Sequence, residues 1–217
     1  MTLIELSHVI RAGMVTYPGL PGPEITAHLS RKESARHYAP GTTFEINRVS
    51  LIGNTGTYLD SPAHRHEDGD DLSAVPLDRL ADLPGLVVRV RPGATPIDRS
   101  HFASYDVTGH AVLVHTGWDR HFGTGRYGAG GHPYLTGEAV DWLVNRDAAL
   151  VGIDSVNIDG TQTGDRPAHT GLLAAGIPIV EHLTRLGELP RAGFRFHAVP
   201  PPMAGMTSFP VRAYAVL

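Results

Sequence analysis

Three apolar runs constrain what this chain can fold into more than any other feature. GLVVRV at 85–90, HAVLVHTGW at 110–118 and ALVGID at 149–154 are rich in β-branched and other apolar residues, as buried strands are. Between the second and third runs, Thr136 is placed to cap a helix whose apolar residues recur at helical spacing to about Arg146. This alternation of strands and helices predicts an α/β fold with one mixed sheet.

Shorter patterns predict the remaining elements. The length of 217 residues fits one domain, so we expect a single domain over 1–217. Further strands are expected at 2–10, 25–32, 44–52, 178–183, 194–200 and 209–217. Helices are expected at 73–83, 97–105 and 168–176. The Gly-rich segment 119–134 is long enough for a loop that covers a site.

The composition excludes several classes of protein. A formal net charge of -4, without long runs of one sign, argues against nucleic acid or a membrane surface as partner. No apolar stretch has membrane length and no signal-peptide pattern opens the chain, so we expect a cytoplasmic protein. Cysteine is absent, so a thiolate can serve neither as nucleophile nor as metal ligand.

A dense polar segment follows the predicted strand at 44–52. The sequence NTGTYLDSPAHRH at 54–66 contains an amide, a phenol, a carboxylate and imidazoles. The strand should hold these side chains at the end of a rigid sheet. Strand periodicity would direct Tyr58 and Asp60 to one face, and the proline kink that follows would turn His64 back toward them. The alternative for a segment of this composition is a polar surface turn.

Titratable side chains recur beyond the ends of predicted strands. Asp60 and His64 follow one predicted strand, His115 ends another, and Asp154 and Asp159 follow a third. Two further titratable residues, His169 and Glu181, flank a predicted helix. In α/β folds, residues at such positions converge on a common crevice. A cluster of His, Asp and Glu without Cys suits either a hard or borderline divalent cation or general acid–base chemistry.

The polar segment also carries a resemblance to a known family. Asn54–His64 resembles the signature His-x-Gly-Thr-His-x-Asp-x-Pro-x-His of the cyclase family, which includes bacterial kynurenine formamidases and isatin hydrolases. IELSHVIRAGMVTYPG, LVHTGW, LVGIDSVNID and HTGLLAAGIPIVEHLTRLGELP resemble other parts of the family, so the similarity covers nearly the whole chain. The resemblance implies a β/β/α fold, a homo-oligomer (a dimer or tetramer), and water-driven cleavage of an amide or lactam in a small aromatic substrate.

The resemblance also implies a metal site. The family's ligands are the two signature His closest to the start, the signature Asp, and a later His and Glu. Asp60, His169 and Glu181 match three of these, and His64 matches the residue expected to act as acid and base. Three protein ligands suffice for an open catalytic site, so these residues could hold one divalent ion, Zn or Mn before Mg. The alternative is that they form a metal-free network with no cofactor.

Asn54 and Tyr58 depart from the family pattern, because they stand where the signature has its two metal-binding histidines. An amide oxygen is a weak zinc ligand, and a neutral phenol with a pKa of about 10 is weaker still. The two replacements should lower zinc affinity and prevent a two-metal arrangement.

Three hypotheses follow. The first is a single-metal hydrolase in which the ion activates water and His64 moves the proton. The second is a metal-independent cyclase, isomerase, dehydratase or lactone hydrolase. In it His64 and Glu181 form the acid–base pair, and Tyr58 and Asn54 donate hydrogen bonds to a developing oxyanion. The third is a non-catalytic binding protein. Because the replacements are hydrogen-bonding rather than apolar residues, they favour an enzyme.

Four residues are candidates for substrate binding. Trp118, Tyr127 and Tyr134, near or within the Gly-rich segment, could form the wall of an aromatic pocket. Arg166 could bind a substrate carboxylate through its guanidinium fork, although a surface ion pair is an equal alternative.

Other polar residues are expected to have supporting roles. Asp154, Asn157 and Asp159 are expected to stabilise their loop. His66 and His182 are expected to lie around the ligands or at the surface.

Overall fold

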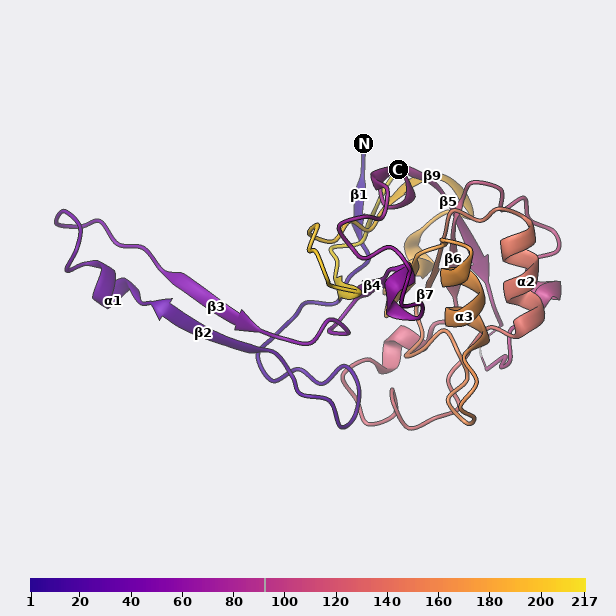
Figure 1. The fold of residues 1–217 in the computed structure, drawn as a ribbon, viewed down its shortest axis with the longest axis horizontal. Helices are drawn as coiled ribbons and strands as arrows, with labels where there is room; N and C mark the ends of the chain where they lie inside the picture. The colour runs from indigo at the N-terminus through magenta and orange to yellow at the C-terminus, as the bar shows by residue number, and fades with distance from the viewer. Residues whose placement is uncertain (92) are drawn as a thin grey trace.

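A nine-stranded mixed sheet forms the body of the computed structural model, which describes residues 1–91 and 93–217 (Figure 1). Its strands are β1 (Leu3–Glu5), β4 (Tyr58–Asp60), β5 (Leu83–Arg89), β6 (Ala111–His115), β7 (Leu150–Ile153), β8 (Ile179–Glu181), β9 (Ala192–His197), β10 (Ser208–Pro210) and β11 (Tyr214–Val216). Their order is β1-β11-β9-β5-β6-β7-β8-β4-β10. Neighbours from β5 to β8 run parallel, and the other pairs are antiparallel. The predicted α/β class with a mixed sheet is confirmed.

Alternate residues of the central strands face two hydrophobic cores, which explains their near-continuous apolar sequence. Val87 of β5 packs in one core with Phe194. Leu86 and Val88, its neighbours, pack in the other core with residues of the two main helices. These helices are α2 (Gly137–Asn145) and α3 (Pro167–Ala174), which lie side by side against the sheet (Figure 1). The predicted runs are therefore buried strands.

The two helices begin where local chemistry predicts. The Thr136 side chain accepts a hydrogen bond from the backbone N–H of Ala139 and caps α2, as expected. Pro167 occupies the first turn of α3, where its missing N–H costs no hydrogen bond. Shorter 3-10 turns are η1 (Pro62–His64), η2 (Leu77–Arg79), η3 (Arg99–His101), η4 (Trp118–His121) and η5 (Leu186–Glu188).

The helix predicted at 73–83 is wrong. Only η2 forms there, because Pro76 lacks a backbone donor and disfavours helical geometry in the residue before it. Asp71, rather than Ser73, organises the turn by accepting hydrogen bonds from the N–H groups of Ser73 and Ala74. The helix predicted at 97–105 is likewise reduced to the single turn η3.

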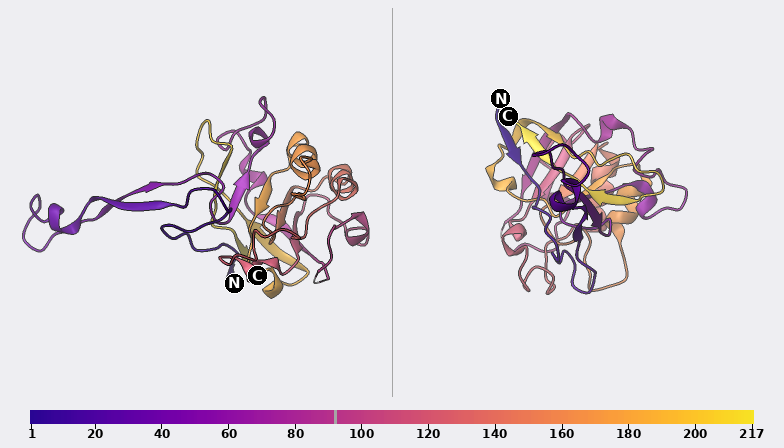
Figure 2. Two further views of the ribbon diagram at one scale, coloured as in Figure 1. Left: turned by 90° about the horizontal axis from the view of Figure 1, so that it is seen from below. Right: turned by 90° about the vertical axis from the view of Figure 1, so that its left-hand side faces the viewer.

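A two-stranded arm projects from the body in Figure 1 and in the left view of Figure 2. It consists of β2 (Glu24–Leu29), the short helix α1 (Arg31–Ser34) and β3 (Ile46–Ser50). Every residue of β3 is exposed. The strand predicted at 44–52 exists, but it belongs to the arm and not to the main sheet.

This placement overturns the expectation that the polar segment follows a strand of the rigid sheet. The segment instead supplies its own strand, β4, which is buried at all three residues and lies between β8 and β10. In the part of the chain that the structure describes, no helix is long and apolar enough to cross a membrane.

Candidate active site

Strand β4 and the turn after it bring three predicted side chains together. In the antiparallel register, Tyr58 lies opposite Glu181 and Asp60 lies opposite Ser208. Tyr58 donates its phenolic hydrogen to Oε2 of Glu181. The 3-10 turn η1 returns the chain, so that Nδ1 of His64 lies 3.7 Å from Oδ1 of Asp60. The structure thus brings Asp60 and His64 together and places Tyr58 against Glu181.

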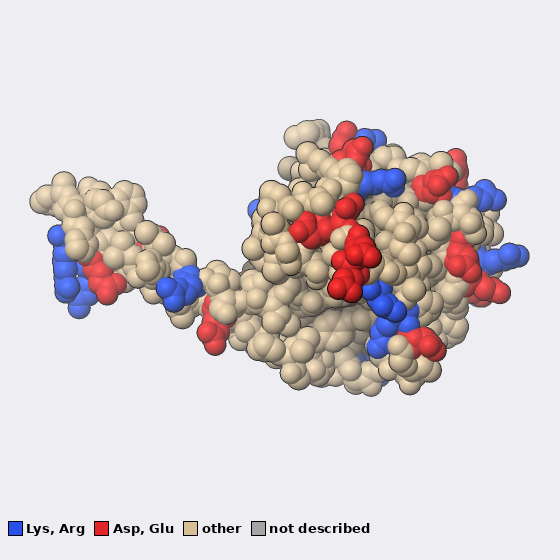
Figure 3. Space-filling view, in the orientation of Figure 1, with Lys and Arg blue, Asp and Glu red and all other residues tan. Residues whose placement is uncertain are grey.

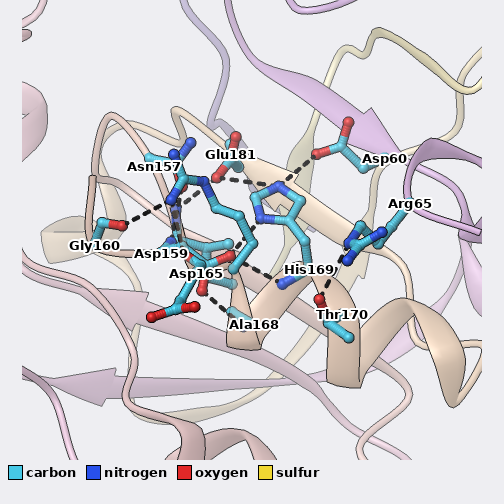
Figure 4. Close-up of polar contacts among 12 residues, drawn as sticks. Asp60, Arg65, Asn157, Asp159, Gly160, Asp165, Ala168, His169, Thr170 and Glu181 are labelled. Carbon is cyan, nitrogen blue, oxygen red and sulfur yellow. Dashed lines mark hydrogen bonds and ion pairs between the residues drawn. The ribbon is translucent and has the colours of Figure 1, made fainter. Parts of the chain in front are cut away.

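His169 enters the same cluster from the first turn of α3. Asp159 accepts hydrogen bonds from the backbone N–H groups of Ala168 and His169, at 2.7 and 3.1 Å, and another from Nδ1 of His169 at 2.6 Å. The other ring nitrogen, Nε2, lies 3.7 Å from Oδ2 of Asp60 and 4.0 Å from Oε1 of Glu181 (Figure 4). Asp159 therefore orients the imidazole of His169 as well as stabilising its own loop. Only the stabilising role was expected from the sequence.

The donor set fits a divalent cation. Asp60 is fully buried, and its Oδ2 has no hydrogen-bond partner among the described residues. A metal-binding His169 would be neutral, and because Asp159 accepts the Nδ1 hydrogen, its Nε2 lone pair would then point to the two carboxylates. Acceptors that face one another in a buried site require either a proton or a cation between them. Ligand atoms of Asp60, His64 and His169 lie within 4.8 Å of one another, so His64 is also within reach of an ion at this place.

Glu181 is the least accessible of the predicted ligands. Its Oε2 accepts from Tyr58, and its Oε1 accepts from the backbone N–H of Ile158 at 2.6 Å. Burial raises the pKa of Glu181 to about 7, against the opposing charge of His169. Burial also raises the pKa of Tyr58 well above its ordinary value, and the Glu181 carboxylate adds to the effect. Tyr58 is therefore a neutral hydrogen-bond donor in this site.

The pKa of His169 responds to opposing effects. Burial alone would lower it, but hydrogen bonds to Asp159 and Asp60 and the charge of Glu181 raise the pKa to about 10. Because the His169 imidazole has so high a pKa, its surroundings favour a positive charge. The orientation of the Asp60 and Glu181 carboxylates toward the ring is consistent with that preference.

Among the described residues, the side chains of Asn54 and of the aromatic candidates make no hydrogen bond to this cluster. Asn54 is half-buried, and no hydrogen bond of its side chain occurs among the described residues. Trp118 is buried against Tyr127, to whose carbonyl its indole N–H donates. Tyr134 packs against Gly160 and His132.

Arg166 borders a hollow of about 670 Å³ beside α3, together with Arg65 and Thr170. Its Nη1 donates to the carbonyl groups of Gly160, Thr163 and Asp165. Arg65 follows His64 directly, and its Nε donates to Thr170 Oγ1 at 3.2 Å. The surface ion pair considered for Arg166 is absent from the described residues.

His182 is fully buried with its ring 5.2 Å from that of Tyr58, so of the two expected places, around the ligands or at the surface, the structure has the first. Its Nδ1 lies 2.8 Å from the hydroxyl of Tyr127. One buried residue of the cluster was missed from the sequence. Ser208 was not predicted at all, although its hydroxyl contacts both Asp60 and His64. A lone serine in a C-terminal strand has no sequence signal that would distinguish it.

Comparisons with known proteins agree with the fold. A family described as "Putative cyclase" matches residues 4–160. A kynurenine formamidase of Salinibacter ruber is 26% identical over 98% of this chain and 96% of its own length. A solved potential metal-dependent hydrolase with cyclase activity is 24% identical, with a TM-score of 0.78, over 99% of this chain and 96% of the other. An isatin hydrolase bound to the product analogue thioisatinate is 22% identical, with a TM-score of 0.83, over 99% and 92% of the two chains.

Proposed function

The chain belongs to the cyclase family, and from this premise we propose that it is a hydrolase that cleaves an amide, lactam or lactone bond in a small aromatic substrate. The relatives named kynurenine formamidase and isatin hydrolase support hydrolysis of bonds of this class. One observation carries the proposal: the buried, unpartnered Oδ2 of Asp60 faces Nε2 of His169.

We assign Asp60, His169 and Glu181 as the residues that would hold one Zn or Mn ion. Asp60 and His169 also belong to the geometric cluster that includes His64, so the choice between Glu181 and His64 decides the third ligand. Glu181 is fully buried, and its negative charge is sustained best beside a cation. When bound, such an ion supplies Lewis-acid chemistry and lowers the pKa of water toward about 7.

His64 would move the proton. Its side chain is 29% exposed, so it can exchange protons with solvent, which buried Glu181 cannot do directly. A partly exposed imidazole close to the bond being broken is suited to act first as base and then as acid toward the leaving nitrogen or oxygen. Tyr58 would hold Glu181 in place through its hydrogen bond.

We further propose that the hollow beside α3 accepts an anionic substituent of the substrate. Arg65 adjoins His64 in the chain, and Arg166 lies across the same hollow. Two guanidinium groups at the margin of a hydrolytic site favour a carboxylate. Trp118 and Tyr134 remain candidates for aromatic contacts, with Trp118 limited by its burial.

A homo-oligomer would account for the exposed arm. A two-stranded ribbon is marginally stable in water unless another surface covers it. Large hydrophobic side chains exposed on the arm are Ile25, Tyr38, Phe44, Ile46 and Val49. At the end of the arm, charged side chains lie along one side and uncharged residues form the other (Figure 3). We assign its covering surface to a second copy of the chain, because closed homo-oligomers are the commonest assemblies.

Elemental analysis of the purified protein, before and after dialysis against a chelator, tests the proposed hydrolase. Hydrolysis of N-formyl aromatic amides and aryl lactones is followed in parallel. We expect about one equivalent of Zn or Mn, with activity that is lost on chelation and restored when the metal is returned.

Activity that is indifferent to the chelator would instead favour metal-independent acid–base chemistry. The Tyr58–Glu181 hydrogen bond and the raised pKa of Glu181 are the observations that favour this second function.

A further inference from the structure

Ser208 joins two residues of the candidate site that do not reach one another. Its Oγ lies 2.5 Å from Oδ1 of Asp60 and 2.8 Å from Nδ1 of His64. Nδ1 of His64 is 3.7 Å from the same carboxylate oxygen, which is too long for a direct hydrogen bond. We propose that Ser208 is a positioning residue that determines which nitrogen of His64 and which oxygen of Asp60 are available for the reaction.

The fold holds the Ser208 hydroxyl firmly. Strand β10 places Ser208 directly opposite Asp60, and the backbone N–H of Ser61 donates to the carbonyl of Thr207 at 2.9 Å. Gly53 lies so close that a Cβ on it would overlap the Ser208 carbonyl oxygen. Ser208 is 2% exposed, so water cannot readily replace its hydroxyl.

The hydrogens available to Ser208 settle the direction of each contact. A serine hydroxyl has one hydrogen and two lone pairs. Asp60 Oδ1 is a carboxylate acceptor, so Ser208 donates its hydrogen there. Its oxygen is then left to accept the hydrogen of His64 Nδ1. His64 is consequently held as the Nδ1–H form, with the lone pair on Nε2.

The hydrogen bond from Ser208 also gives the two carboxylate oxygens of Asp60 different surroundings. Oδ1 is occupied by Ser208, whereas Oδ2 has no partner among the described residues and faces His169. Asp159 has the corresponding effect on His169, because it accepts the Nδ1 hydrogen and so directs Nε2 to Asp60. Ser208 and Asp159 thus orient His64 and His169, respectively. Residues that orient ligands in this way typically affect metal affinity or activity by about 10–100-fold.

Nitrogen-15 NMR of the histidine rings, in protein stripped of metal, tests the tautomer without any substrate. We expect His64 to be the Nδ1–H tautomer in the wild type and to shift toward Nε2–H in Ser208→Ala. Ser155→Ala is the matched control, because Ser155 is also fully buried but its hydroxyl has no partner among the described residues. An unchanged His64 tautomer in Ser208→Ala would overturn the proposal.

Zinc affinity, measured by competition with a colorimetric chelator, provides the second readout. We expect Ser208→Ala to weaken zinc binding by about 10–100-fold, and Ser155→Ala to leave it within about twofold. This arm of the inference rests on the proposed function. A wild type that binds no zinc would contradict the proposed hydrolase, whereas the tautomer result would still decide the role of Ser208.

Discussion

Strands β3 and β4 are separated in the chain only by residues 51–57, yet their surroundings are opposite. Every residue of β3 is exposed, and every residue of β4 is buried. The strand β3 was predicted from its alternating pattern, whereas β4 lies in the polar segment that was predicted to follow a strand. The difference shows that a local pattern does not specify the surface that a segment will meet. The buried strand supplies Tyr58 and Asp60 to the candidate site, and the exposed strand leaves its side chains at the surface.

The largest effects are expected from replacing His64 and Glu181, and the two replacements should differ in whether the protein still binds its ion. His64→Asn should lower kcat by about 10²–10⁴-fold while the protein still binds its ion, because it removes a proton carrier. Glu181→Gln should lose the ion itself, because it removes a buried negative charge. Metal content and kcat are measured on both variants. Loss of metal from His64→Asn with retention in Glu181→Gln would show that the ligand set is Asp60, His64 and His169 instead.

A smaller loss is expected from the residue that orients His169. Asp159→Asn should lower metal affinity or kcat by about 10–100-fold, since an amide has one acceptor oxygen, and its NH2 group would replace either the oxygen that accepts from Ala168 or the one that accepts from His169. Asp165→Asn, on an exposed position of the same loop, is the control. Equal behaviour of the two variants would remove Asp159 from the site.

The sequence predicted the body better than it predicted the surroundings of each element. The strands at 85–90, 110–118 and 149–154 are apolar on both faces, and only a sheet covered on both sides satisfies that pattern. The convergence of Asp60, His64 and His169 was predicted because they follow elements that end near one crevice. Pro76 shows the opposite case, since the prediction gave more weight to Ser73 as a cap and Pro84 as a stop than to this visible helix breaker.

Long-range pairing explains what could not be predicted. Ser208 meets Asp60 only because β10 pairs with β4 from the other end of the chain. Nothing near Ser208 in the sequence specifies that partner. The arm was missed for a similar reason. A half-apolar strand has the same sequence pattern whether its apolar face is buried by its own chain or by another chain.

Replacing a carboxylate should lower the free energy of unfolding more in the body, where Asp154 is buried, than in the arm, where Glu45 is exposed. Asp154 accepts hydrogen bonds from the backbone N–H groups of Thr116 and Gly117 and from the Thr116 hydroxyl. Asp154→Asn would set an amide donor against one of these donors and should cost about 1–3 kcal/mol in urea unfolding. Glu45→Gln, which removes the exposed arm pair with Arg31, should change stability by less than about 1 kcal/mol. Similar costs at both positions would contradict the comparison.

The arm itself should affect assembly and not body stability. Tyr38 and Phe44 pack edge to face at the end of the arm, with 48% and 51% of their surfaces exposed. Replacing both with Ser should shift the protein toward the monomer in size-exclusion chromatography with light scattering. Its circular dichroism spectrum should remain that of the wild type. A wild type that is already monomeric at all concentrations would refute the assigned role of the arm.

The smallest effect is expected on substrate preference. Arg65→Gln should reduce the ratio of kcat/KM for N-formylanthranilate over formanilide, because only the first substrate carries a carboxylate. Arg146→Gln is the control, since Arg146 lies over the Trp142 ring on α2, away from the hollow. An unchanged ratio would remove the hollow from the substrate site.

The central claim is that a cation binds between Asp60, His169 and Glu181. A crystal grown with Mn²⁺, with anomalous diffraction data collected at the manganese edge, locates such an ion directly. The account predicts one anomalous peak bonded to Asp60 Oδ2 and His169 Nε2, with Glu181 as the third protein ligand. The absence of a peak at full Mn²⁺ saturation, or a peak away from Asp60 and His169, would contradict it.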